Sequence, residues 1–207
     1  LKLKEDMRER GIIPSSIFTA CLKDARIKND KILIPGKTRV FEMSPVDLTV
    51  SQRKYFLPFY SAYQTSWKTC EHTIGINVHS HDWTYLANKL TDFSPYILAG
   101  DYSNFGPQAD INLLFHVVDI QIAWLKQQGY DREAIQQCEM LKYELLHAPV
   151  IVGRYLLRFY AGMHSGNAAT VILNSGLNSL YIRLAWKAIM RKTGYGSMEN
   201  FNKFVLL

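Results

Sequence analysis

The sequence lacks any apolar run near the ~20 residues that a membrane-spanning helix needs. Its first ten residues, LKLKEDMRER, are charged throughout, which is typical of neither a signal peptide nor a membrane anchor. Cysteine is scarce, because Cys21, Cys70 and Cys138 are widely spaced and odd in number. That pattern fits neither a disulfide framework nor a zinc site, so we expect reduced thiols in a cytosolic protein.

Common catalytic motifs are missing as well. The chain has no G-x-S-x-G, H-E-x-x-H, Walker A or G-x-G-x-x-G sequence. His79 and His81, in HSHDW, are similar to the start of the metal-binding run of metallo-β-lactamase-like hydrolases, but Trp83 stands where a further histidine belongs. Surface or capping histidines are the simpler interpretation, and a metal-dependent hydrolase stays as a remote alternative.

Positive charge is abundant and uneven. The chain carries a net charge of +6. Its length of 207 residues is sufficient for one domain or two closely packed subdomains. Between Lys23 and Arg39 six basic residues face only two acidic ones. A positive field of this kind suits phosphates or a nucleic-acid backbone, although a solvated basic face is an equally simple interpretation.

Hydrophobic periodicity predicts a mixture of helices and strands without regular βαβ alternation, and therefore the α+β class. We expect helices within 1–20, over 49–68 with an interruption at Pro58, from Ser80, from Asp110, and over 167–192. The helix from Asp110 carries an apolar stripe, formed by Ile111, Leu114, Phe115, Val118, Ile122 and Leu125. We expect extended segments on both sides of Pro35-Gly36, a strand over 96–99, and a hairpin over 150–162.

Two polar groups stand out against this background. Asp101 follows the predicted strand, where a carboxylate can hold a hard cation, or can simply be a turn residue. Thr170 and Asn174 are one helical turn apart, so they share a face and can hydrogen-bond a ribose hydroxyl. Ser165 and Gly166 precede them and allow a close backbone approach to a ligand. A capped helix with a buried Asn is the plainer alternative.

The order of these segments carries a resemblance. KDARIKNDKILIPGKTRVFEMSP, AGDYSNFGP and GMHSGNAATVILNS follow one another along the chain. This series resembles the RNA-dependent RNA polymerases of picorna-like positive-strand RNA viruses, nearest to those of dicistroviruses and iflaviruses, from about Cys21 onward. S-G-x-x-x-T-x-x-x-N is its most specific motif. GINVHSHDW looks like the G-x-N segment that this group carries before its first catalytic Asp.

The resemblance implies a right-hand polymerase, here the fingers plus part of the palm, with the thumb absent. Residues 1–95 would be fingers, with motif F at 23–42, and 96–130 would be palm with motif A. Residues 131–160 would connect fingers and palm, and 161–207 would be palm with motif B, ending before motif C. Because that motif carries the second metal-binding aspartate, we expect this chain alone to be inactive.

The resemblance also implies roles for individual residues. Asp101 would be catalytic and would bind Mg²⁺ or Mn²⁺ as the first aspartate of motif A. The nucleotide-binding residues would be Lys23, Arg26, Lys31, Lys37, Arg39, Ser165, Gly166, Thr170 and Asn174, with Arg39 as the best candidate for a triphosphate contact. One departure is Gly106, which stands where most relatives have a second Asp.

The implied partners are an RNA template and product strand, nucleoside triphosphates and other parts of a viral polyprotein. The implied location is the host cytoplasm, in a membrane-associated replication complex. A non-catalytic RNA-binding domain that uses the same basic segment is the main alternative.

Overall fold

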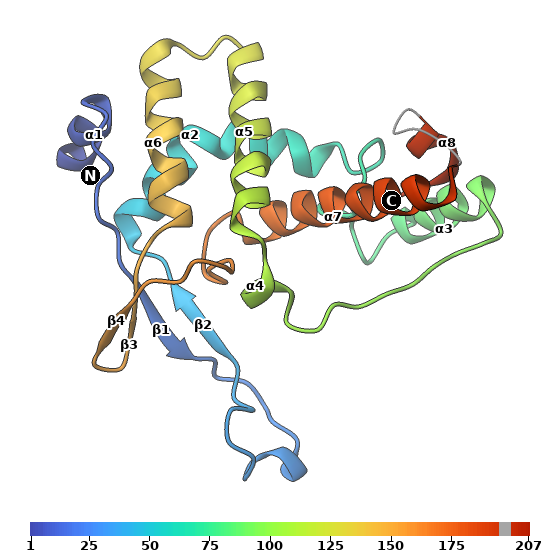
Figure 1. The fold of residues 1–207 in the computed structure, drawn as a ribbon, viewed down its shortest axis with the longest axis horizontal. Coiled ribbons are helices and arrows are strands. Elements are labelled where there is room, and N and C mark those ends of the chain that lie inside the picture. Colours follow the sequence, from blue (N-terminus) through green and yellow to red (C-terminus); the bar gives the residue numbers. More distant parts are fainter. Residues whose placement is uncertain (195–199) are drawn as a thin grey trace. The chain divides into compact units, whose positions relative to one another are not determined.

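The computed structural model describes residues 1–194 and 200–207 (Figure 1). Residues 195–199, inside the predicted palm segment 161–207, lie outside the described residues. The helices are α1 Lys2–Glu9, α2 Val46–Thr65, α3 Asp82–Phe93, α4 Phe105–Gln108, α5 Ile111–Gln127, α6 Arg132–Leu146, α7 Thr170–Thr193 and α8 Phe201–Phe204. The strands are β1 Phe18–Leu22, β2 Val40–Met43, β3 Val150–Val152 and β4 Tyr155–Leu157. The predicted mixture of helix and sheet is confirmed. No helix in the described part is long and apolar enough to cross a membrane.

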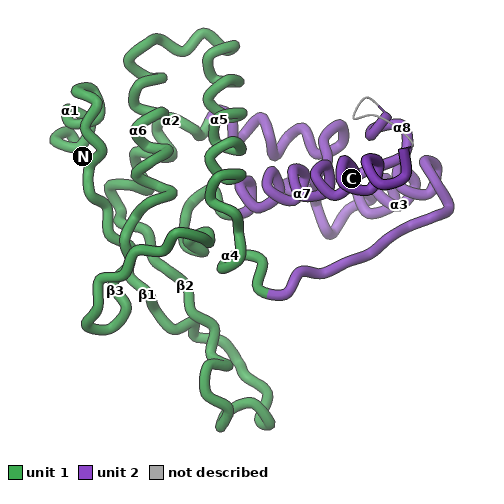
Figure 2. Tube along the Cα trace, in the orientation of Figure 1, with its two compact units in different colours: residues 1–57, 104–170 green, residues 58–103, 171–207 purple. Residues whose placement is uncertain are grey.

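The chain forms two compact units (Figure 2). Unit 1 comprises residues 1–57 and 104–170, and unit 2 comprises residues 58–103 and 171–207. Helices α2 and α7 each begin in unit 1 and continue in unit 2. The division of the chain into fingers and palm segments stays a prediction.

Unit 1 contains a four-stranded sheet of order β2-β1-β3-β4. Strand β1 pairs antiparallel with β2 and parallel with β3, and β3 pairs antiparallel with β4. The β3–β4 pair is the hairpin that the sequence predicts. Only the second of the two segments expected around Pro35-Gly36 is a strand, because residues 29–31 form a 3-10 turn and Leu33 is 92% exposed. Without a neighbouring strand, an apolar segment has no ladder to join.

Helices α5 and α6 run antiparallel and contribute a large part of the core of unit 1 (Figure 1). Helix α5 begins where Asp110 accepts hydrogen bonds from two backbone N–H groups, and α6 begins where Asp131 accepts one from the backbone N–H of Ala134. The predicted apolar stripe of α5 is largely buried, with Leu114, Val118, Ile122 and Leu125 at most 2% exposed. Such burial contributes most of the stability of an amphipathic helix.

Helix α1 is joined to α6 by a buried ion pair. The guanidinium of Arg8 lies 2.7 Å from the carboxylate of Glu144, and both side chains are fully buried. Ser16 and Lys4 also contact this carboxylate. Because an unpaired buried charge costs several kcal/mol, the pair fixes where α1 can dock.

Unit 2 is helical. Trp67 packs edge-on against Tyr85 of α3, and Trp186 of α7 stacks on Phe204 of α8. Arg183 pairs with Glu71, which holds the pKa of that carboxyl below its usual value. Helix α2 runs through Pro58, so the predicted interruption is wrong: proline removes one backbone donor, and the helix tolerates that loss.

Candidate functional site

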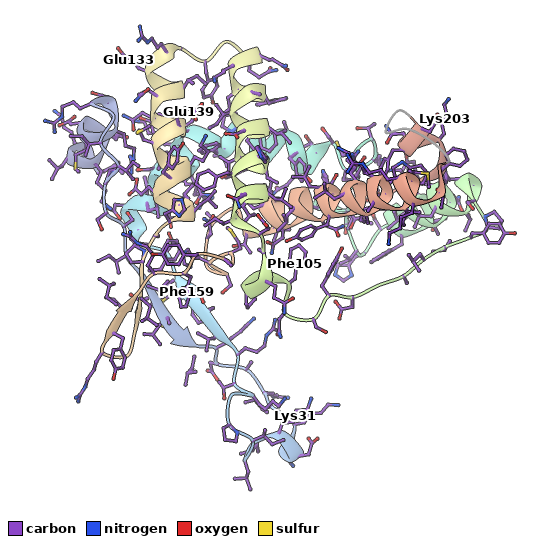
Figure 3. All side chains as sticks on the ribbon, in the orientation of Figure 1. Lys31, Phe105, Glu133, Glu139, Phe159 and Lys203 are labelled. Carbon is purple, nitrogen blue, oxygen red and sulfur yellow. The ribbon has the colours of Figure 1, made fainter. Side chains whose placement is uncertain are left out.

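The loop between β1 and β2 gathers positive charge. Residues 23–39 extend away from the sheet, with Lys31 on the loop (Figures 1 and 3). A cavity of about 210 Å³ opens in this loop. The residues that line it are Lys23, Ala25, Arg26, Ile27, Lys28, Lys31, Lys37 and Arg39. All six basic residues of the segment thus surround one space, and neither of its two acidic residues lines it. We call these six residues the cationic loop.

The cationic loop stays open to solvent. Its six basic side chains are exposed, and the backbone N–H of Lys23 donates to the carbonyl of Arg39 at 2.8 Å, which closes the base of the loop. Like charges held this close repel one another, so a polyanion that neutralises them binds favourably. The arrangement can accept phosphate groups from several directions.

A second polar element is the turn that leads into α7, residues 162–169, which we call the B turn. Ser165 donates from its backbone N–H and from its hydroxyl to one carboxylate oxygen of Glu42, both at 3.0 Å. A Cβ on Gly166 would lie only 2.0 Å from the carbonyl oxygen of Glu42, so only glycine fits there. Ser165 and Gly166, predicted together, are therefore both held against β2.

Buried side chains hold the B turn from its other side. His164 stacks on Phe18 with ring centroids 4.4 Å apart, and its Nε2 lies 3.1 Å from the carbonyl oxygen of Ala148. Burial lowers the pKa of His164, although Glu42 and the Ala148 carbonyl act against this. Asn167 accepts a hydrogen bond from Gln52 at 2.8 Å. The ring of His164 therefore favours its neutral form in this setting.

The start of α7 carries the remaining predicted B-motif residues. The hydroxyl of Thr170 donates to the carbonyl of Asn167 at 2.7 Å, so it closes the B turn. One turn later, the amide oxygen of Asn174 is buried and has no hydrogen-bond partner among the described residues. A buried acceptor without a donor is unfavourable, and a ligand hydroxyl that donates to it would remove that cost. Thr170 is the last residue of unit 1 in this segment, and Asn174 belongs to unit 2.

Asp101 lies outside any strand, and the predicted strand over 96–99 is wrong. Tyr96 is 91% and Leu98 is 98% exposed, and this segment pairs with no strand in the described part of the chain. A short apolar run needs neighbouring strands to satisfy its backbone, and none is described here. Asp101 itself is exposed, with no hydrogen-bond or ion-pair partner among residues 1–194 and 200–207.

The residue after Asp101 attaches the segment to α7. The Tyr102 hydroxyl lies 2.9 Å from the amide oxygen of Asn178, to which it donates. Asn178 is one helical turn beyond Asn174, on the same face of α7. Within unit 2, Asp101 is therefore next in sequence to Tyr102, which is hydrogen-bonded to α7. The same helix carries Asn174, which is predicted to contact the ribose.

One carboxylate does not make a metal site. Among the described residues, no group of three or more His, Cys, Asp or Glu could hold a metal ion. Asp101 suits a hard cation by its chemistry, since it is an exposed and unpaired oxygen donor, but further ligands have to come from elsewhere. The two histidines 79 and 81 lie in a turn that leads into α3, where Ser80 accepts from the backbone N–H of Asp82 at 3.1 Å.

Gly106 lies in α4, beside the first residues of the B turn. Its carbonyl accepts a hydrogen bond from Met163 at 2.9 Å, and Gly162 donates to the carbonyl of Ala109 at 2.9 Å. A Cβ on Gly106 would meet nothing closer than the Met163 carbonyl at 3.8 Å. Steric crowding therefore does not require glycine at this position.

Sequence reasoning missed several residues that shape these elements. Glu42, Gln52, Phe18 and Tyr102 act through partners at least 76 residues away in sequence. Glu42 follows Arg39 in the segment predicted to bind phosphate. A glutamate at this position does not indicate, from sequence, that its side chain contacts Ser165. Only the pairing of distant segments brings these side chains together.

A solved structure shares the fold. The chain is similar to the Sicinivirus 3Dpol RNA-dependent RNA polymerase, with a TM-score of 0.65 and 21% identity over 84% of this chain and 36% of that one. That likeness shows a polymerase fold of the right-hand type that the sequence predicts.

Sequence comparison then shows the family. The family model for viral RNA-dependent RNA polymerase matches residues 3–204, so the chain belongs to this family. It is 39% identical to the genome polyprotein of deformed wing virus, over 88% of this chain and 6% of the polyprotein. It is 32% identical to the replicase polyprotein of Drosophila C virus, over 100% of this chain and 12% of that polyprotein. The predicted picorna-like, insect-virus relationship is confirmed, and the chain spans a small part of these relatives.

Proposed function

We propose that this chain is part of an RNA-directed RNA polymerase that copies an RNA template by nucleotidyl transfer from nucleoside triphosphates. The observation that supports this most is the junction between two nucleotide-handling motifs in unit 1. Strand β2 begins directly after Arg39 of the cationic loop, and its Glu42 holds Ser165 of the B turn. The segment proposed to bind phosphate and the turn proposed to contact the nucleotide are thus joined through one strand.

In this proposal the cationic loop holds the triphosphate of the incoming nucleotide. Arg39 presents a planar guanidinium, which can make paired bonds to phosphate oxygens, and the lysines neutralise the remaining charge. The amide oxygen of Asn174 would accept a hydrogen bond from a ribose hydroxyl, which explains its lack of a partner among the described residues.

Asp101 would supply one oxygen ligand of a divalent metal site for Mg²⁺ or Mn²⁺. Two such ions, when bound, stabilise the attacking and leaving oxygens of phosphoryl transfer. The other ligands would come from residues outside this chain, and the chain alone would then be inactive. The proposed partners are RNA, nucleoside triphosphates and other parts of the polyprotein, in membrane-associated replication complexes of the host cytoplasm.

The direct test is nucleotide incorporation by the full-length polymerase that contains this chain. Asp101→Ala should lower incorporation on a primed RNA template by roughly 100-fold or more, the effect of removing one group that stabilises the transition state. Asp92→Ala is the matched control, because Asp92 is also exposed in unit 2. Equal activity of the two variants would contradict the assigned role of Asp101.

The alternative is a non-catalytic RNA-binding domain, which the exposed cationic loop by itself would also suit. That function predicts RNA affinity that falls steeply with salt and does not respond to divalent metal. Wild-type full-length protein that binds RNA but incorporates no nucleotide, with Mg²⁺ or with Mn²⁺, would favour it.

A further inference from the structure

The end of strand β2 touches the B turn through both its side chain and its backbone. One carboxylate oxygen of Glu42 accepts two hydrogen bonds from Ser165, each of 3.0 Å. Hydrogen bonds to an ionised carboxylate are about twice as strong as neutral ones. Two donors from a single residue also fix its orientation, because both the backbone and the side chain of Ser165 are held at once.

The backbones meet at the next residue pair. Met43 and Gly166 form an isolated parallel β-bridge. The approach is so close that a Cβ on Gly166 would lie 2.0 Å from the Glu42 carbonyl oxygen. The strand thus defines the position of the turn, and the Glu42 side chain defines the direction of Ser165.

The contacts of Ser165 differ from those of its neighbours in the turn. Asn167 is 5% exposed, and His164 stacks on fully buried Phe18. The Ser165 contact with Glu42 is exposed to solvent. Packing therefore holds the flanking residues, whereas the orientation of Ser165 depends on one carboxylate that water can reach.

We propose that Glu42 is a positioning residue of the polymerase reaction, which orients Ser165 by accepting its backbone and hydroxyl hydrogen bonds. The inference rests on the proposed function, together with the nucleotide-binding role that the resemblance implies for Ser165. Glu42 touches neither the nucleotide nor a metal in this proposal. It removes the rotational freedom that Ser165 would otherwise lose at each binding event, and such preorganisation favours the reactive geometry.

Glu42 also lies close to Arg39 along the chain. Arg39 and Glu42 are three residues apart, about 10 Å along an extended chain. The residue proposed to hold the triphosphate and the residue that holds Ser165 are therefore joined by one short strand in unit 1. The residue before the strand would thus hold the triphosphate, and a residue of the strand would orient Ser165.

The first experiment measures the contact without activity. Hydrogen exchange of the Ser165 amide in the full-length protein should be at least ~10-fold faster in Glu42→Ala, because its acceptor is gone, and near wild type in Glu42→Gln, which keeps an oxygen there. Glu133→Ala is the matched control, since Glu133 is an exposed carboxylate on α6 of the same unit (Figure 3). Unchanged exchange in Glu42→Ala would overturn the proposal.

The second experiment measures incorporation with a set of variants. Glu42→Ala should lower kcat/KM for the nucleotide about 10-fold, and Glu42→Gln should recover most of that loss. In the double variant with Ser165→Ala the combined loss should be smaller than the product of the two single losses, because Glu42 acts through Ser165 and only the backbone donor of that residue remains. Losses that do multiply, or no rescue by Gln, would contradict the positioning role.

These outcomes separate the two proposals. If the wild-type protein incorporates nucleotides and Glu42→Ala is unaffected in both experiments, the positioning role fails and the proposed function stands. If the wild-type protein incorporates none, the proposed function fails, and with it the positioning role.

Discussion

The Tyr102 hydroxyl donates to the amide oxygen of Asn178 at 2.9 Å, across 76 residues of sequence. This bond joins the segment that carries Asp101 to helix α7, within unit 2. Asp101 has no anchoring partner of its own among the described residues, so its neighbour limits where the carboxylate can move. The position of the proposed metal ligand thus depends on a tyrosine that does no chemistry itself.

Removing this hydroxyl should weaken catalysis without unfolding the protein. We expect Tyr102→Phe to lower incorporation by the full-length polymerase about 3- to 10-fold, the value of one hydrogen bond. Tyr96→Phe is the control, because Tyr96 is 91% exposed and its hydroxyl has no hydrogen-bond partner among the described residues. The same loss in both variants would show that the Tyr102–Asn178 bond does not position Asp101.

The cationic loop should bind phosphate through charge. Arg39→Ala should weaken binding of single-stranded RNA or nucleoside triphosphate, and it should lower the slope of log affinity against log salt by about one for each phosphate that Arg39 neutralises. Fluorescence anisotropy at several salt concentrations measures both quantities. Arg132→Ala, which removes an exposed arginine on α6, should leave them unchanged. Equal slopes for the two variants would mean that phosphate binds elsewhere.

Gly166, in the B turn, and Gly106, beside it, should respond differently to alanine. Gly166→Ala places a methyl group 2.0 Å from a backbone oxygen, so the turn must leave β2, and incorporation should fall more than ~10-fold. Gly106→Ala meets only an ordinary 3.8 Å contact, and its stability should stay within about 0.5 kcal/mol of wild type. Thermal melts and incorporation assays compare them. A fully active Gly166→Ala protein would mean that the strand and the turn are not joined.

His164 should make stability depend on pH. Burial lowers its pKa in the folded state from the ordinary 6.5, so below that pH the unfolded chain binds a proton that the folded one does not. The free energy of unfolding should therefore fall as pH drops through 6.5 and further below it, and this fall should be smaller in His164→Gln. Denaturant titrations across this range measure it. Burial also lowers the pKa of His72. His72 therefore contributes to the pH dependence of stability that remains in His164→Gln.

Local patterns predict well where neighbours in sequence carry the information. The stripe of α5, the β3–β4 hairpin and the six cations of residues 23–39 need only short-range periodicity or charge, and the structure has all three. The strand expected before Asp101 fails for the opposite reason. Four apolar residues satisfy a strand pattern, but a strand exists only when other strands accept its hydrogen bonds.

The sequence alone determined the family, the helical periods and the concentration of positive charge in residues 23–39, because these depend on order and local spacing. Tertiary structure alone decided that Glu42 holds Ser165 and that Tyr102 holds Asn178. It also decided that Gly166 admits no side chain, whereas Gly106 would. The reason is physical: hydrogen bonds between residues 76 to 123 positions apart form only after the chain has folded, and no local pattern encodes them.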